Sequence, residues 1–163
     1  MLSLVLLLLS PGASQALNRE YKAGFKAALW GAKDRGVKYA WGFESLYTKA
    51  NCSGLIFAAA REAGIPGIRR TTALEMRYGR GGWTGHDVGM RDAEECDLIW
   101  FSWKNRPDRP HGHVGVLLEG RQSGNLGVLN ASQTRGFVIW DEYGGVLERD
   151  TSAIRRLTIG DPQ

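Results

Sequence analysis

The first half of the chain places apolar side chains at the spacing of α-helices. Two helices are predicted, one from about Arg19 to Lys33 and one from Cys52 to Ala63, because their apolar residues recur on one helical face. An asparagine stands immediately before each, and such a side chain caps a helix by accepting a hydrogen bond from a free backbone N–H. A short third helix is expected to begin after Thr71 or Thr72 and to run through Met76.

The second half has the pattern of β-strands. The runs predicted to be strands are 97–101, 113–118, 126–131, 137–140 and 154–159. The segments expected to be loops or turns are 79–89, 104–112 and 119–125. Helices followed by closely spaced strands predict an α+β fold, with N-terminal helices packed on a small antiparallel β-sheet. No repeat or linker divides the chain, so residues 17–163 are expected to form a single domain.

The N-terminal segment has the features of a signal peptide. Residues 1–9 are apolar apart from Ser3, and Ser14 and Ala16 are small residues at the positions that a signal peptidase reads. Cleavage after Ala16 is therefore expected, with residues 1–16 removed. The apolar run is shorter than the ~20 residues that a membrane span needs. The predicted location is secreted or periplasmic, without stable membrane insertion; the alternative is a buried N-terminal strand or helix.

Composition and charge restrict the possible partners. The chain has 163 residues, of which 43% are hydrophobic and 23% charged, values ordinary for one globular domain. A formal charge of +4 is compatible with an anionic polymer, but lysine and arginine form no run, so no nucleic acid is expected as a partner. The Arg69-Arg70 pair is interpreted as a solvated face, with contact to an acidic substrate as the alternative. Three histidines without metal-site spacing predict no metal, although His111 and His113 would share a strand face.

Two cysteines remain after the predicted cleavage. A single disulfide is the ordinary interpretation for an exported protein. However, Cys52 begins a predicted helix, whereas Cys96 precedes a predicted strand within Glu94-Glu95-Cys96-Asp97. These different contexts favour two free thiols.

Cys52 and His113 have the contexts of a nucleophile and its base. Free N–H groups and the helix dipole favour a thiolate in the first turn of a helix, and the small Ser53 and Gly54 leave room for a substrate carbonyl. An imidazole at the start of the strand could take the thiol proton and later protonate a leaving amine. Asn130, on the next strand, would lie across a hairpin and orient the imidazole. The structural alternatives are a packing cysteine, a strand histidine and an edge-strand amide.

Several short motifs occur in a distinctive order. They are Tyr39-x-Trp41-Gly42, Cys52-Ser53-Gly54-Leu55, Arg70-Thr71-Thr72, Asp97-Leu98-Ile99-Trp100-Phe101, Gly112-His113-Val114-Gly115-Val116 and Leu129-Asn130-Ala131-Ser132. In this order the chain resembles the NlpC-type family of bacterial cell-wall cysteine peptidases over about residues 37–139. The resemblance implies a papain-like fold in permuted order, helices first and then a small antiparallel sheet, which agrees with the pattern above.

The resemblance also implies roles for the candidate residues. Cys52 would be the nucleophile, His113 the base and Asn130 the third polar residue, and Tyr39 matches a tyrosine that helps to stabilise the oxyanion. Further candidates for oxyanion or substrate binding are Ser53 and Trp41. The implied substrate is the peptide stem of peptidoglycan, cut at the bond from D-glutamate to the diamino acid. No metal or organic cofactor is implied.

Three positions depart from the family pattern. Asn51 replaces the usual aspartate before the nucleophile, Phe43 replaces a second glycine, and Cys96 replaces a glycine that often precedes the Asp-Leu strand. They leave the catalytic residues in place. Two alternatives stay open: an amidase or acyltransferase with the same fold, and a non-catalytic cell-wall-binding module. The sequence indicates no inhibitor or immunity protein.

Overall fold

A computed structural model describes residues 15–102 and 110–159. Most of the predicted signal peptide and most of the expected loop 104–112 lie outside the described residues. Within the described ranges, no helix is long and apolar enough to cross a lipid bilayer.

The predicted helices form, with bounds close to those expected. The helical elements are α1 (Arg19–Asp34), α2 (Cys52–Glu62), α3 (Ala73–Arg77), the 3₁₀ turns η1 (Arg80–Gly82) and η2 (Met90–Asp92), and α4 (Val146–Asp150). The side-chain oxygen of Asn18 accepts a 2.9 Å hydrogen bond from the Tyr21 N–H, and Asn51 accepts one of 2.7 Å from the Gly54 N–H. Thr72 and Glu75 form a reciprocal capping box at the start of α3. Helix α4 was not predicted, because five residues are too few to show helical periodicity.

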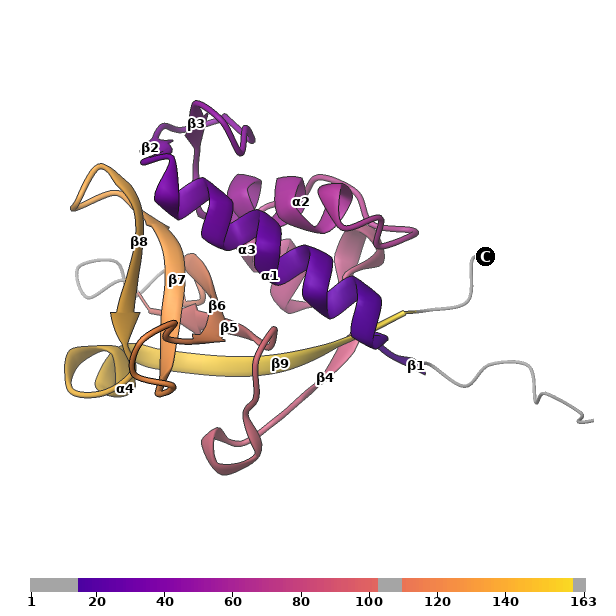
Figure 1. The fold of residues 1–163 in the computed structure, drawn as a ribbon. Helices are drawn as coiled ribbons and strands as arrows, with labels where there is room; N and C mark the ends of the chain where they lie inside the picture. The colour runs from indigo at the N-terminus through magenta and orange to yellow at the C-terminus, as the bar shows by residue number, and fades with distance from the viewer. Residues whose placement is uncertain (1–14, 103–109, 160–163) are drawn as a thin grey trace, which may run out of the picture.

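The strands form one curled mixed sheet (Figure 1). They are β1 (Gln15–Ala16), β2 (Lys38–Tyr39), β3 (Lys49–Ala50), β4 (Gly85–Asp87), β5 (Leu98–Phe101), β6 (His113–Glu119), β7 (Leu126–Ser132), β8 (Phe137–Glu142) and β9 (Thr151–Ile159). The order is β1-β9-β5-β6-β7-β8-β2-β3, and β4 pairs with β9. All pairs are antiparallel except β2 with β3. The α+β prediction is confirmed, with this one parallel pair as a difference.

Two sequence predictions are wrong in detail. The segment 79–89, expected to be a loop, contains η1 and β4, and β4 pairs with β9. The final strand begins at Thr151 rather than at residue 154. Both errors have one cause. The residues of β4 and of the start of β9 are extended because a distant strand supplies their hydrogen bonds, and their sequences lack the alternation of apolar and polar residues that predicts a strand. The same is true of β1, in which Gln15 and Ala16 pair with Ile159 and Thr158.

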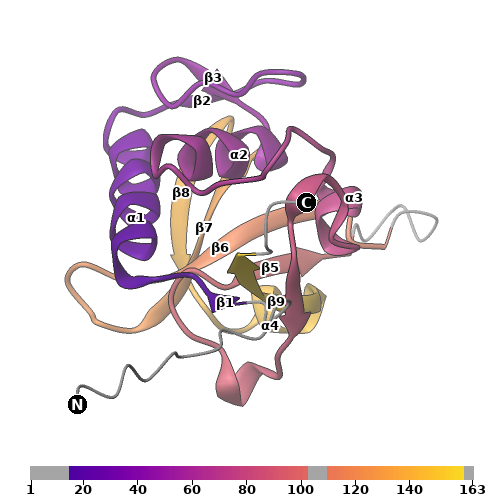
Figure 2. The same ribbon diagram turned by 90° about the vertical axis from the view of Figure 1, so that its right-hand side faces the viewer.

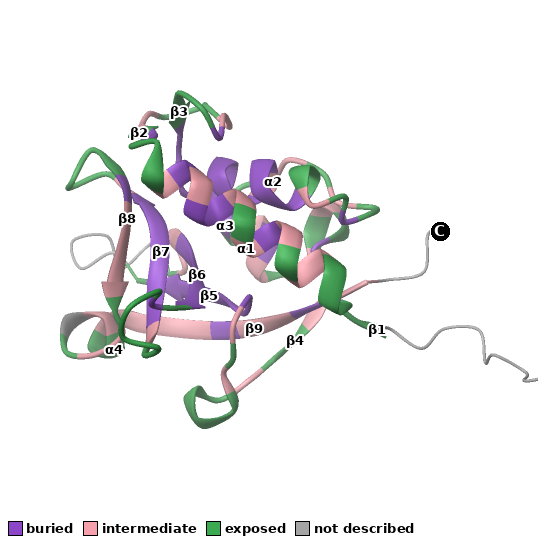
Figure 3. Cartoon of the chain, viewed as in Figure 1, coloured by how far each residue is buried: buried purple, intermediate pink, exposed green. Residues whose placement is uncertain are grey.

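The sheet separates two apolar layers. Helices α1 and α2 cover one face, as Figures 1 and 2 show, and the buried residues of α2 and of the central strands meet there (Figure 3). That layer includes Phe25, Leu55, Val116 and Leu129. The opposite face carries a smaller cluster, packed against α4 and its neighbours, that comprises Ile99, Phe101, Leu117, Val128 and Ile154.

Strand alternation decides where the predicted site residues lie. Successive side chains of a strand point to opposite faces. His113 therefore shares the face of Leu117, and Asn130 shares the face of Val128, which is the face that α4 covers. Because His113 is the first residue of β6, it also lies at the end of the strand, where the start of α2 reaches the sheet.

Candidate active site

Cys52 is the first residue of α2, held by the cap that precedes it. The Asn51 side chain bonds the Gly54 N–H and leaves the other N–H groups of the first turn near the thiol. A Cβ at Gly54 would lie 2.7 Å from Oδ1 of Asn51 and would also collide with the Phe43 carbonyl. Glycine at this position therefore lets the segment before the helix pack closely against its first turn. Asn51, which stands where the family usually has an aspartate, therefore retains the helix-capping function of that aspartate.

The Cys52 thiol contacts the His113 imidazole, although Cys52 is only 6% exposed. Burial raises the pKa of Cys52, but three opposing effects together outweigh it: the His113 hydrogen bond, the His113 charge, and the backbone N–H groups of Val114 and Ser53. The net pKa is therefore below the usual value for a cysteine. Burial lowers the pKa of His113, but the hydrogen bond and charge of Cys52 and the Asn130 hydrogen bond raise it above its usual value. The lowered pKa of Cys52 and the raised pKa of His113 both favour a thiolate–imidazolium pair.

Asn130 completes a linear chain of contacts. Nε2 of His113 lies 3.0 Å from Oδ1 of Asn130, which can only accept, so Nε2 donates. The ring nitrogen left to face Cys52 is Nδ1. Gly115, two residues after His113 in β6, packs closely against β7: a Cβ there would lie 2.6 Å from Cγ1 of Val128 and 3.3 Å from Cβ of Asn130. The hairpin prediction that His113 and Asn130 are neighbours is confirmed.

Tyr39 lies close enough to Cys52 for the thiolate charge to act on its phenol. Burial, followed by the Cys52 charge, raises the pKa of Tyr39 to about 12. The phenol therefore stays protonated at neutral pH and remains a hydrogen-bond donor. Trp41 packs edge-on against the Tyr39 ring, with the ring centroids 5.8 Å apart. Trp41 is itself 59% exposed, so its face is open to solvent beside the site.

Ser53 is buried, and its hydroxyl accepts a 2.9 Å hydrogen bond from Nη1 of Arg70. Nη2 of the same guanidinium donates to Oδ1 of Asn51 at 3.0 Å, and Nε forms an ion pair of 3.0 Å with Glu44. The interpretation of Arg70 as part of a solvated face is therefore wrong, because the side chain clamps the start of α2. Sequence reasoning missed this role and that of Glu44, since neither residue is near Cys52 in the helical pattern.

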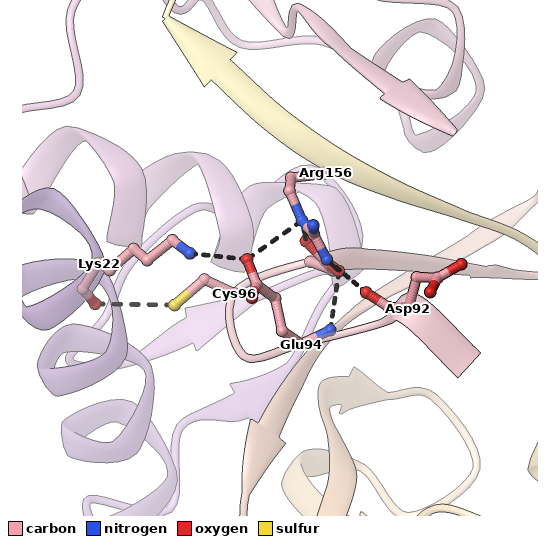
Figure 4. Close-up of polar contacts among 6 residues, drawn as sticks. Lys22, Asp92, Glu94, Cys96 and Arg156 are labelled. Carbon is pink, nitrogen blue, oxygen red and sulfur yellow. Dashed lines mark hydrogen bonds and ion pairs between the residues drawn. The ribbon is translucent and has the colours of Figure 1, made fainter. Parts of the chain in front are cut away.

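The second cysteine, Cys96, lies beside the first turns of α1, in a different environment from that of Cys52 (Figure 4). Sγ of Cys96 contacts the backbone oxygen of Lys22 at 3.7 Å, and burial followed by the charge of Glu95 raises the pKa of Cys96 to about 12. Cys96 has a φ of 73°, a left-handed conformation that glycine adopts without cost. This explains why glycine suits that position. Both cysteines are free thiols, so the disulfide alternative is wrong.

The remaining histidine of the suggested metal pair points elsewhere. Nδ1 of His111 contacts Oγ of Ser152 at 2.7 Å. Burial and the nearby Arg77 charge lower the pKa of His111. In the described ranges, no group of three or more histidine, cysteine, aspartate or glutamate side chains is arranged to hold a metal ion.

The architecture is that of known proteins. No model of a known protein family matches the sequence, and no curated protein sequence does. Among solved structures, a Staphylococcus aureus protein described as similar to a lipoprotein of the NLP/P60 family matches with a TM-score of 0.64 at 20% identity, over 89% of this chain and 44% of that one. The chain has the NlpC/P60 fold. It spans about half the length of this relative.

Two Mycobacterium tuberculosis structures with the NlpC/P60 fold differ in what their descriptions say they do. The peptidoglycan hydrolase RipB matches with a TM-score of 0.55 at 22% identity, over 87% of this chain and 69% of RipB. RipD, described as a non-catalytic NlpC/p60 domain protein adapted to peptidoglycan binding, matches with a TM-score of 0.56 at 17% identity, over 85% of this chain and 98% of RipD. The fold is therefore compatible with hydrolysis and with binding alone.

Proposed function

We propose that this protein is a cysteine peptidase that hydrolyses the peptide stems of bacterial peptidoglycan, at the bond from D-glutamate to the diamino acid. The observation that carries the proposal is the continuous contact from Cys52 through His113 to Asn130. A binding module has no need of a buried thiol whose pKa is lowered by an imidazole. RipB, a peptidoglycan hydrolase of the same fold, supports the choice of substrate.

In the proposed mechanism each step has a side chain that carries it out. The Cys52 thiolate attacks the scissile carbonyl carbon, and the carbonyl electrons move to oxygen. In this mechanism the Tyr39 hydroxyl and the Cys52 backbone N–H would hold that oxyanion. His113 then gives its proton to the leaving amine, the C–N bond breaks, and a thioester remains on Cys52.

Water completes the turnover at the same groups. His113, now neutral, takes a proton from the water that attacks the thioester, and the second tetrahedral intermediate collapses to a carboxylate with release of the thiolate. His113 keeps the proton that it took from this water, which restores the starting ion pair, and the proton of the new carboxyl group leaves to solvent. Asn130 holds the ring in one orientation through both steps. No metal or organic cofactor takes part in these steps.

We also propose that the protein is exported, with residues 1–16 as its signal peptide and residues 17–163 as the single mature domain. Cleavage after Ala16 would remove the two-residue strand β1 and leave β9 paired with β5 and β4. Secretion or a periplasmic location would bring the proposed active site to the peptidoglycan. N-terminal sequencing of the protein recovered outside the cytoplasm tests the cleavage position.

The decisive experiment is digestion of purified peptidoglycan, with the products read by mass spectrometry. The protein should release fragments with a new N-terminal diamino acid, and Cys52→Ala should release none while keeping its far-ultraviolet circular dichroism. Equal release by Cys52→Ala would contradict the proposed nucleophile. A Ser45→Ala control removes a half-buried hydroxyl that accepts hydrogen bonds from the Tyr47 and Thr48 N–H groups in the loop before α2, and it should retain the activity.

Wall binding without cleavage is the second candidate, because RipD has the same fold and is described as non-catalytic. It predicts that the protein co-sediments with peptidoglycan but releases no fragment, and that Cys52→Ala binds as well as the parent protein. An amidase or acyltransferase would instead act on a different amide or acyl substrate and would produce no new diamino acid terminus.

A further inference from the structure

A cavity of about 390 Å³ opens beside the proposed catalytic pair, on the face of the sheet that α4 covers. His113 and Asn130 form part of its wall, so the cavity is continuous with the site. The turn between β7 and β8 closes one side, and Leu147 and Asp150 of α4 close another. Phe101 and Ser102, at the end of β5, also line it.

The position of the cavity identifies which part of a substrate it would hold. In thiol catalysis the imidazolium protonates the leaving amine, so the leaving group must lie on the histidine side of the nucleophile. A cavity lined by His113 and not by Cys52 therefore lies on the leaving-group side. For the proposed reaction the leaving group begins with the diamino acid, whose side chain ends in a second, free ammonium group.

The charges of the cavity suit such a group. Asp141, on β8, is half-buried in the wall, and within residues 15–102 and 110–159 no hydrogen bond or ion pair engages its carboxylate. Asp150 adds a second carboxylate, which Arg149 contacts at 3.3 Å. Besides the His113 imidazolium, the one cation of the described lining is Arg135, exposed at the rim, where a guanidinium would meet the terminal carboxylate of a leaving peptide.

We propose that this cavity is the leaving-group subsite and that Asp141 binds the side-chain ammonium of the diamino acid. The inference rests on the proposed function and adds a preference to it. A cross-link turns that ammonium into a neutral, bulkier amide, which cannot pair with a carboxylate. The enzyme therefore selects stems that are not cross-linked through the diamino acid.

The test compares four synthetic tripeptides, L-alanyl-γ-D-glutamyl-lysine and its meso-diaminopimelate counterpart, each with the side-chain amine free or acetylated. Acetylation removes the charge and imitates the cross-link. The parent protein should cleave the peptides of one diamino acid, and within that pair kcat/KM should be about tenfold higher for the free amine than for the acetylated form. The difference should lie mainly in KM, because the acetylated peptide loses a hydrogen bond between charged groups. Asp141→Asn should cleave the two forms equally, at the rate that the parent shows on the acetylated peptide.

A matched control removes a charge of the same sign nearby. Glu148 is exposed on α4 and does not line the cavity, so Glu148→Gln should keep the tenfold preference. The activity of Asp141→Asn on the acetylated peptide serves as its own proof of folding. Equal cleavage of free and acetylated forms by the parent, or an unchanged preference in Asp141→Asn, overturns the subsite assignment and leaves the proposed function standing. Cleavage of none of the four peptides overturns both.

Discussion

Nε2 of His113 donates to Oδ1 of Asn130 across 3.0 Å, so the asparagine holds the edge of the imidazole that faces away from Cys52. The two residues are on neighbouring antiparallel strands, β6 and β7, and Gly115 of β6 has no side chain to crowd Asn130. The contact therefore depends on strand register as well as on residue type. It orients the ring and favours its charged form.

Asn130→Ala should lower kcat/KM about tenfold to hundredfold, because a hydrogen bond to a charged group contributes ~1.5–3 kcal/mol. The pH profile should change as well. Activity rises as pH increases through the lowered pKa of Cys52 and falls as pH increases through the raised pKa of His113. Since Asn130 contributes to raising the His113 pKa, its loss should move the alkaline limb to lower pH. An alkaline limb that stays in place would show that the amide does not act on the imidazole.

The two thiols should differ sharply in reactivity. Iodoacetamide should modify Cys52 at a pH well below that needed for Cys96, because the pKa of Cys52 is lowered and that of Cys96 is raised to about 12. His113→Gln should move the midpoint for Cys52 to higher pH, since burial then acts without the opposing imidazolium. Peptide mapping after timed alkylation follows both residues in one sample, with Cys96 as the internal reference. A midpoint for Cys52 that His113→Gln does not move would disprove the ion pair.

Gly115→Ala should disturb the site through packing. The new Cβ would lie 2.6 Å from Cγ1 of Val128 and 3.3 Å from Cβ of Asn130, in the buried space between two central strands. Overpacking of this kind costs ~1–3 kcal/mol, and the shift of Asn130 should also reduce kcat. Gly89→Ala is the control, because Gly89 has a φ of −74° and the nearest atom to its added Cβ is 3.8 Å away. Urea unfolding and peptide cleavage measure both variants, and equal stability for the two would refute the packing argument.

Arg156→Ala should be among the more destabilising surface-accessible substitutions. Arg156 binds both carboxylate oxygens of Asp97 at 3.0 Å, and the Asp97 side chain is 2% exposed. Removing the arginine leaves a buried charge with one backbone partner, the Glu94 N–H, at a cost of about 3 kcal/mol. Asp34→Asn breaks the exposed pair with Arg121 and should cost below ~1 kcal/mol. Urea midpoints compare the two; similar losses would contradict the assigned difference in burial.

Local pattern was sufficient for the elements that form the frame of the site. Helical periodicity in the sequence predicted the first two helices, and Asn18 and Asn51 marked where they begin. Short apolar runs predicted strands β5 to β8. The placement of Cys52 at a helix start follows from the Asn51 cap, which is visible in the sequence. The neighbourhood of His113 and Asn130 follows from a hairpin with a short turn.

Long-range pairing decided the rest. Other strands supply the hydrogen bonds that hold β2, β3, β4 and the start of β9 extended. The hydrophobic pattern within such a segment does not show which strand it will pair with. The Arg70 clamp on Asn51 and Ser53 joins residues separated by a whole helix. The cavity beside His113 exists only where α4, the β7–β8 turn and the sheet meet. Sequence periodicity thus determined which segments are helix or strand and which residue types could react, whereas their packing in three dimensions determined the depth of the site, its charge and the room beside it.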